Sequence, residues 1–177
     1  MKISDVNIII DYKTLQLSEN GFFMGKIYFQ ADDYIYPDAN CFSNPLNIMR
    51  WLLREMRLLI ESKAEITERY IYFSLEDPYH IYLCYLGNNL VALKFPKTIN
   101  KISNDMIITA VSEDYNKEIH TITCNYSDLF KIAYNEGTKL FNMINVAEAP
   151  KNGEVLMLGV ELEYSKRIIN KIKRNEI

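Results

Sequence analysis

Residues 44 to 61 carry the clearest helix pattern in the chain, and this pattern constrains the fold most. Asn44 can cap the first turn through its side-chain oxygen, and Pro45 follows where a missing N–H group is not needed. Apolar residues recur at three- and four-residue spacing and form one face: Ile48, Met49, Leu52, Leu53, Met56, Leu59 and Ile60. The opposite stripe is mostly basic: Asn47, Arg50, Arg54, Arg57 and Glu61. We therefore predict a long helix that lies on a sheet and points a solvated basic face outward.

Strand patterns surround this helix. Residues 69–75 and 79–86 alternate aliphatic residues with tyrosine, histidine and cysteine, which is the period of two expected of a sheet. Residues 105–112 and 118–125 fit a further hairpin. The remaining predicted strands are 3–11, 22–30 and 90–95.

The C-terminal third of the chain has helical periodicity, although residues 155–164 fit either a strand or a helix. We predict one α+β domain over residues 1–177. It would have an antiparallel sheet of about six to seven strands, one long helix packed on it, and C-terminal helices.

Composition excludes several classes of function. The chain has 177 residues and a net charge of −3, which does not favour nucleic acid as a partner. The three cysteines are widely spaced and form no CxxC pair, so we expect neither a disulfide framework nor a zinc site, and no cofactor. The sequence shows no secretory signal and no apolar run long enough to span a bilayer. These features predict a cytoplasmic protein that does not bind membranes.

Residues 31–43 combine three carboxylates with two tyrosines and form the strongest candidate for a contact surface. Rigid aromatic anchors ringed by acids suit a basic protein partner, because the aromatics bury area and the acids steer the encounter. The alternative is that the aromatic residues pack down onto the sheet. The spacing of the acids lacks the pattern of a calcium loop, so we expect no metal there. The predicted partner-binding residues are Asp32, Asp33, Tyr34, Tyr36 and Asp38.

The two histidines suggest a second kind of site. His80 shares a strand face with Cys84, and His120 shares one with Cys124. Residues four apart on one strand lie about 13 Å apart, so a Cys–His couple would have to form across strands. A strand cysteine is more often a small buried hydrophobe. A ligand pocket between helix and sheet is the remaining alternative, and its predicted lining is Tyr72, His80 and Tyr82.

Residues 22–95 resemble a group of small bacterial α+β proteins. The resemblance rests on residues 25–29 (GKIYF), 36–38 (YPD), 44–53 (NPLNIMRWLL) and 72–81 (YFSLEDPYHI). In that group a G-x-I-x-F strand, an F-P-D turn and a W-x-D entry precede a helix with a tryptophan, and an F-x-F-M-D-G-P-Y-x-I hairpin follows. This chain has Cys-Phe-Ser at 41–43 in place of W-x-D. Many members of the group look like immunity proteins, which are cytoplasmic, non-enzymatic partners that block the toxin domain of a polymorphic toxin.

The predicted function is therefore binding of another protein without catalysis, as an immunity protein that neutralises a bacterial toxin domain. Two alternatives stay open. One is a small-ligand-binding or enzymatic domain with the pocket described above. The other is a homodimer formed through the tyrosine-rich sheet face.

Overall fold

The structure is a computed structural model of the chain. It describes residues 2–61, 68–72, 79–96, 98–103, 106–111, 119–146, 152–174 and 176. The strands in chain order are β1 (Val6–Leu17), β2 (Phe23–Ala31), β3 (Tyr34–Tyr36), β4 (Phe42–Ser43), β5 (Glu68–Tyr72), β6 (His80–Gly87), β7 (Leu90–Pro96), β8 (Thr98–Ser103), β9 (Met106–Val111) and β10 (Ile119–Asn125). The helices are α1 (Pro45–Glu61), α2 (Tyr126–Val146) and α3 (Gly153–Lys173).

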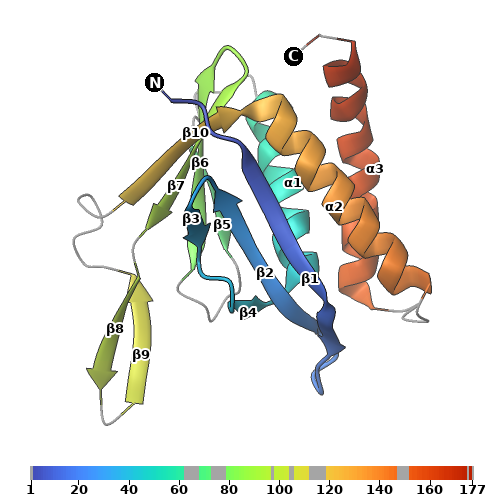
Figure 1. The fold of residues 1–177 in the computed structure, drawn as a ribbon. Coiled ribbons are helices and arrows are strands. Elements are labelled where there is room, and N and C mark those ends of the chain that lie inside the picture. The colour runs from blue at the N-terminus through green and yellow to red at the C-terminus, as the bar shows by residue number, and fades with distance from the viewer. Residues whose placement is uncertain are drawn as a thin grey trace.

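The α+β class with antiparallel pairing is confirmed, but the prediction of one sheet of six to seven strands is wrong. Within the described residues, the strands form two four-stranded sheets and a two-stranded ribbon. The first sheet has the order β1-β2-β3, with β4 also on β2, and the second has the order β10-β7-β6-β5. The Ser4 N–H group donates to the Thr123 carbonyl at 2.9 Å, which joins the start of β1 to β10. Beyond this point β1 runs alongside α2 (Figure 1), so the two sheets separate.

The predicted hairpin between residues 105–112 and 118–125 is also wrong. The strand β9 pairs with β8, whereas β10 pairs with β7. In the register of β10 with β7, Ile122 lies opposite Leu93, and Cys124 lies opposite Val91. All four side chains are buried, so pairing with β7 places the apolar face of β10 in the core. The expected turn at residues 113–116 lies outside the described residues.

The predicted helix is confirmed as α1, and its N-terminal cap is as expected, because the Asn47 N–H group donates to Asn44 Oδ1 at 3.0 Å. Its apolar face is buried except for Ile60, which is partly buried, and α1 packs on α2 and α3 as well as on β2, β5 and β6. However, α1 is not the one long helix of the fold, since it has 17 residues and both α2 and α3 have 21. Residues 155–164 are helical and belong to α3.

The helices α1 and α3 lie side by side and run in the same direction. Near their starts, Asn44 Nδ2 donates to Glu154 Oε1 at 2.7 Å, and further along, Arg57 contacts Glu161. The basic stripe of α1 is therefore not simply a solvated outer face, because α3 covers one side of it.

An aromatic cluster packs the two sheets together near β3 and β7. The ring of Phe95 lies 4.9 Å from that of Tyr36, 5.5 Å from that of Tyr34 and 6.4 Å from that of Phe29 (centroid distances). Phe95 belongs to the second sheet and the other three residues to the first. The core is thus continuous although the hydrogen-bonded sheets are separate.

Candidate functional site

The predicted acidic residues lie at the β2–β3 hairpin and just after it. Asp32 and Asp33 form the two-residue turn between the paired residues Ala31 and Tyr34, and Asp32 adopts the positive φ of 51° that such a turn requires. Asp32 accepts hydrogen bonds from Lys2 Nζ at 2.6 Å and from Ser4 Oγ at 3.1 Å. These contacts lower the pKa of Asp32. The lysine therefore offsets part of the negative charge expected at this turn.

The two predicted tyrosines are placed differently from one another. Tyr36 is only 4% exposed, and its hydroxyl donates to the His80 carbonyl at 3.0 Å. Tyr34 is half-buried and stacks on His120, with 3.8 Å between ring centroids. Asp38 accepts a hydrogen bond from the Asn40 N–H group at 2.6 Å. Tyr36 thus packs into the core, as the alternative interpretation expected, while Tyr34 reaches the edge of the surface.

A hollow of about 480 Å³ lies beside this hairpin, between β3 and β10. Asp32, Asp33 and Tyr34 line it, together with Lys2 and His120. The structure therefore brings three of the five predicted partner-binding residues to one concave surface. Because this surface carries groups of both signs, it is less acidic than the sequence alone indicates.

The residues of the alternative pocket lie on the neighbouring strands β5 and β6. His80 and Tyr82 share one face of β6, where His80 Nε2 lies 2.9 Å from the Tyr82 hydroxyl. The alternate residues Ile81 and Leu83 are fully buried in the core on the other face. Tyr72 pairs with His80 in the β5–β6 register.

All three cysteines, Cys41, Cys84 and Cys124, are buried. Burial raises the pKa of the Cys124 thiol to about 12, so the nucleophilic thiolate is scarce at neutral pH. Among the described residues, no group of His, Cys, Asp and Glu side chains is arranged to hold a metal ion. The described helices also include none that is long and apolar enough to cross a membrane.

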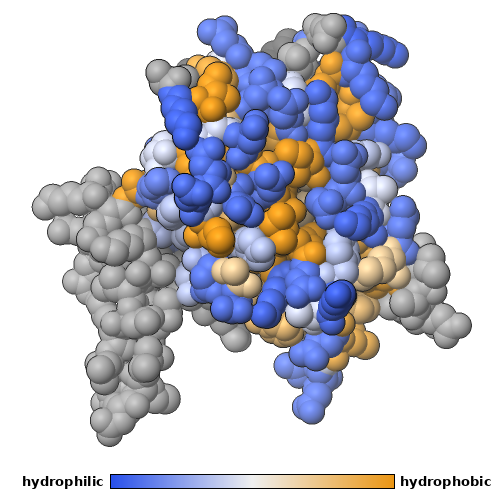
Figure 2. Space-filling model, viewed as in Figure 1, coloured by the Kyte–Doolittle hydropathy of each residue, from blue (hydrophilic) through white to orange (hydrophobic). Residues whose placement is uncertain are grey.

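Figure 2 shows the face on which β1 and α2 lie side by side. Hydrophilic residues cover most of this face, and hydrophobic residues form a band in its middle. A hollow of about 460 Å³ lies where the start of β1 passes the start of α2, lined in part by Ile3, Val6, Leu129 and Ile132. Val6 and Leu129 are buried in the core, whereas Ile3 is exposed at the edge of this hollow.

A larger exposed apolar surface lies on α3, and sequence reasoning missed it. Leu156 is 59% exposed, Met157 51%, Val160 52% and Tyr164 48%, and we call these four residues the α3 stripe. They lie at helical spacing on the side of α3 that faces away from its buried residues. The sequence did contain a sign of this surface, because apolar residues fall on both sides of a helix drawn through residues 155–164. The ambiguity between strand and helix concealed it.

The α3 stripe continues into a shallow depression of about 410 Å³ at the start of the helix. Met157 and Phe22 contribute apolar walls, and Arg50 and Glu154 contribute charged ones. Asn152 caps α3 by accepting from the Glu154 N–H group at 2.9 Å, and its side-chain amide donates to the Gly21 carbonyl at 2.7 Å. The β1–β2 turn is thereby fixed against the start of α3, so the stripe and the depression form one surface.

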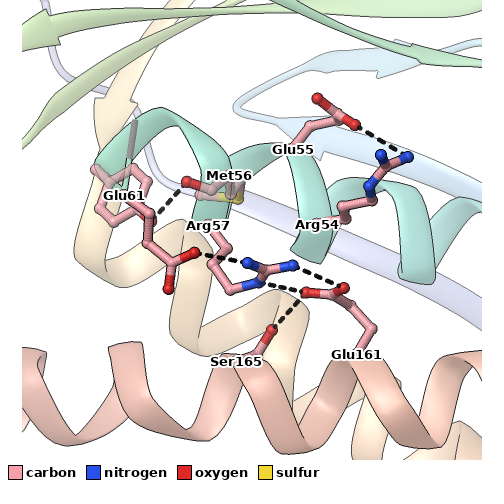
Figure 3. Close-up of polar contacts among 8 residues, drawn as sticks. Arg54, Glu55, Met56, Arg57, Glu61, Glu161 and Ser165 are labelled. Carbon is pink, nitrogen blue, oxygen red and sulfur yellow. Dashed lines mark hydrogen bonds and ion pairs between the residues drawn. The ribbon is translucent and has the colours of Figure 1, made fainter. Parts of the chain in front are cut away.

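A partly buried ion network holds α3 against α1 (Figure 3). Arg57 Nε donates to Glu161 Oε1 at 2.8 Å, and Arg57 Nη2 donates to Glu161 Oε2 at 3.2 Å, which is a bidentate contact. Arg57 Nη1 also donates to Glu61 at 2.6 Å. The Arg57 guanidinium lies 5.2 Å from the ring of Tyr164. The network therefore positions a member of the α3 stripe as well as the helix.

Glu55 forms a second, looser part of this region. It is 7% exposed, and its carboxylate lies 3.8 Å from guanidinium nitrogens of Arg54 and Arg69. Burial raises the pKa of Glu55, and the two arginines offset this only in part. Removal of the buried charge should therefore affect stability in a pH-dependent way.

We expect Glu55→Gln to stabilise the protein more at neutral pH than at about pH 4. A carboxyl whose folded-state pKa is raised contributes stability below its unfolded pKa and loses it as pH rises through the folded pKa. Glutamine does not titrate, so the difference in unfolding free energy between variant and wild type should grow with pH. Urea unfolding of both proteins at the two pH values measures this difference. A difference that is constant with pH would contradict the raised pKa.

Similarity to known proteins does not assign this chain to a family. Comparisons with family models, with curated proteins and with solved structures gave no match. The resemblance of residues 22–95 to bacterial immunity proteins therefore rests on the sequence motifs, and it stays a prediction.

Proposed function

We propose that this protein binds another protein without catalysing a reaction, and that it neutralises a bacterial toxin domain in the cytoplasm. The observation that carries the binding part is the α3 stripe, in which four large apolar side chains are each about half exposed on one helix. Single exposed hydrophobic residues are ordinary, but a contiguous group marks an interaction surface. Covering it removes apolar area from water, which contributes about 25 cal/mol per Å².

The state of the candidate catalytic groups supports a non-enzymatic role. The Cys124 thiol is buried with a raised pKa, and the His80 ring is hydrogen-bonded to Tyr82. His120 stacks on Tyr34 at the edge of a hollow that lacks a neighbouring thiol in its described lining. The toxin as partner is supported by the resemblance of residues 22–95. The acidic residues at the β2–β3 hairpin remain a second predicted contact surface.

The proposal is tested by affinity capture followed by co-expression. Tagged wild-type protein and the Val160→Asp variant are used to capture partners from extracts of the native cells. We expect the wild type to retain one partner in stoichiometric amount and the variant to lose it, because a carboxylate at Val160 would be desolvated in the interface. Circular dichroism of the variant checks that the exposed substitution leaves the fold intact.

The captured partner is then expressed in bacteria with and without this protein. Growth arrest by the partner alone, relieved by the wild type and not by Val160→Asp, is the expected result. Equal capture by both proteins would exclude the α3 stripe as the contact. A partner that does not arrest growth would overturn the toxin-neutralising role and leave protein binding in place.

A further inference from the structure

The outer face of α3 changes character along its length. Its first half carries the α3 stripe, and its second half carries exposed cations. Arg167 lies seven residues after Val160 and three after Tyr164, and Lys171 and Arg174 follow at four- and three-residue spacing. This spacing keeps the cations on the same face as the stripe. The face extends over about 22 Å from Leu156 to Lys171, at 1.5 Å per residue.

Few acids lie along this cationic half. Glu163 is 3.7 Å from Lys166, and Glu176 is 3.8 Å from Arg174. Both pairs are exposed, so each contributes little and is screened by salt. The chain as a whole has a net charge of −3, so the positive charge on this face is a local concentration.

The neighbouring helix α1 adds one more guanidinium group, that of Arg50. Arg50 lies 5.1 Å and Arg54 4.7 Å from the ring of Trp51, the one tryptophan of the sequence. Stacking on an aromatic ring holds a guanidinium in place. The Arg50 guanidinium is also held by Asn47, since its Nη2 donates to Asn47 Oδ1 at 3.1 Å. Arg50 also lines the depression that borders Met157. Arg50 and the outer face of α3 are thus parts of one surface, whereas Arg54 lies on the side of α1 away from α3 and contacts Glu55 (Figure 3).

We infer that this surface binds a protein segment that combines apolar residues with a cluster of carboxylates. The inference rests on the proposed function of protein binding, and it names the surface and the chemistry of the partner. Apolar side chains of the segment would cover the α3 stripe, and its carboxylates would meet Arg167, Lys171 and Arg50. This assignment is opposite in sign to the basic partner that the sequence predicted for the β2–β3 hairpin.

A second copy of the chain does not supply this complement. Two-fold pairing of the stripes would place apolar residues on apolar residues, but it would leave both cationic halves without acids. The partner is therefore expected to be a different protein.

Two synthetic peptides of about 18 residues test the inference. Both have the same leucine spacing along one helical face, so they differ only in the charge of their polar positions. One carries glutamate and the other lysine at the polar positions, and binding of each to the full chain is measured by fluorescence anisotropy. We expect the glutamate peptide to bind and the lysine peptide not to bind. Raising salt from about 50 to about 300 mM should weaken binding of the glutamate peptide about tenfold.

Variants locate the contact. We expect Arg167→Glu and Val160→Asp each to weaken binding of the glutamate peptide about tenfold or more. The matched control is Lys131→Glu on α2, which changes the net charge equally at an exposed helical position and should leave the affinity unchanged. Asp33→Lys at the β2–β3 hairpin should also have no effect on this peptide.

Several results would overturn the inference. They are preferential binding of the lysine peptide, an equal loss with Lys131→Glu, and no binding of the glutamate peptide. Binding of anionic phosphatidylglycerol vesicles with the same dependence on Val160 and Arg167 would assign the surface to a membrane instead. Self-association that is lost in Val160→Asp, measured by sedimentation, would assign it to a second copy. If co-expression still shows toxin neutralisation, protein binding stands and only the acidic partner is excluded.

Discussion

Replacing Arg57 with alanine is expected to lower the free energy of unfolding by about 3–5 kcal/mol. The Arg57 side chain is 15% exposed and that of Glu161 is 8% exposed, so the substitution leaves a buried carboxylate without its bidentate partner. Ser165 Oγ lies 3.4 Å from Glu161 and cannot replace the guanidinium. Denaturant unfolding followed by circular dichroism measures the change.

The matched control is Glu61→Gln, which removes the other carboxylate that Arg57 contacts. The side chain of Glu61 is 38% exposed, so this change should cost less than about 1 kcal/mol. The double variant Arg57→Met/Glu161→Leu should recover most of the stability lost in Arg57→Ala, because no unpaired charge remains. If the double variant is as unstable as Arg57→Ala, the loss comes from packing and not from the buried charge.

Local patterns were sufficient for α1 and for the strands β2, β6 and β7, because these elements depend on the periodicity of neighbouring residues. The short strands β3 and β4 and the strand β8 were not predicted. The N-terminal cap at Asn44 follows from the same short-range chemistry. The partner of Arg57 could not be found in this way, since Glu161 lies 104 residues further along the chain. A basic stripe on one helix has the same sequence pattern whether water or a second helix covers it.

The division into two sheets could not be predicted from the sequence for a related reason. Each strand pattern fixes which side chains face the core, but it does not say which edge of a strand meets another strand. One edge of β1 pairs with β2, and its other side lies against α2. The pairing of β10 with β7 instead of β9 has a similar cause. It depends on which pairing buries the apolar face of β10, and this is decided by residues that are distant in the sequence.

The predicted contact residues show the same limit. Tyr34 and Tyr36 are two residues apart on one short strand and look equivalent in the sequence. Both contact Phe95, but Tyr34 stacks on His120 whereas the Tyr36 hydroxyl donates to the His80 carbonyl, and both histidines lie on strands of the other sheet. The exposed α3 stripe became recognisable only when residues 155–164 were known to be helical. Exposure on a surface is a property of tertiary packing, so the candidate site was less predictable than the elements that carry it.

Phe95→Ala is expected to lower the free energy of unfolding by about 3–5 kcal/mol, the usual range for truncating a buried phenylalanine. Phe95 is fully buried, and its ring is the one that Phe29, Tyr34 and Tyr36 of the first sheet all contact. The cavity would lie between the sheets, so the β2–β3 hairpin should lose support. Hydrogen exchange at the amides of β3 is expected to accelerate more than exchange in α3.

Leu86→Ala on the neighbouring strand β6 is the matched control, because Leu86 is 48% exposed. It should change stability by less than about 0.5 kcal/mol and leave exchange in β3 unaltered. A similar small effect of Phe95→Ala would contradict the role of this ring in joining the sheets. A large loss of stability without faster exchange in β3 would mean that the hairpin is held by other contacts, among them the hydrogen bond from Tyr36 to His80. The cluster around Phe95 would then support the second sheet alone, and the hollow lined by Tyr34 would keep its shape in the variant.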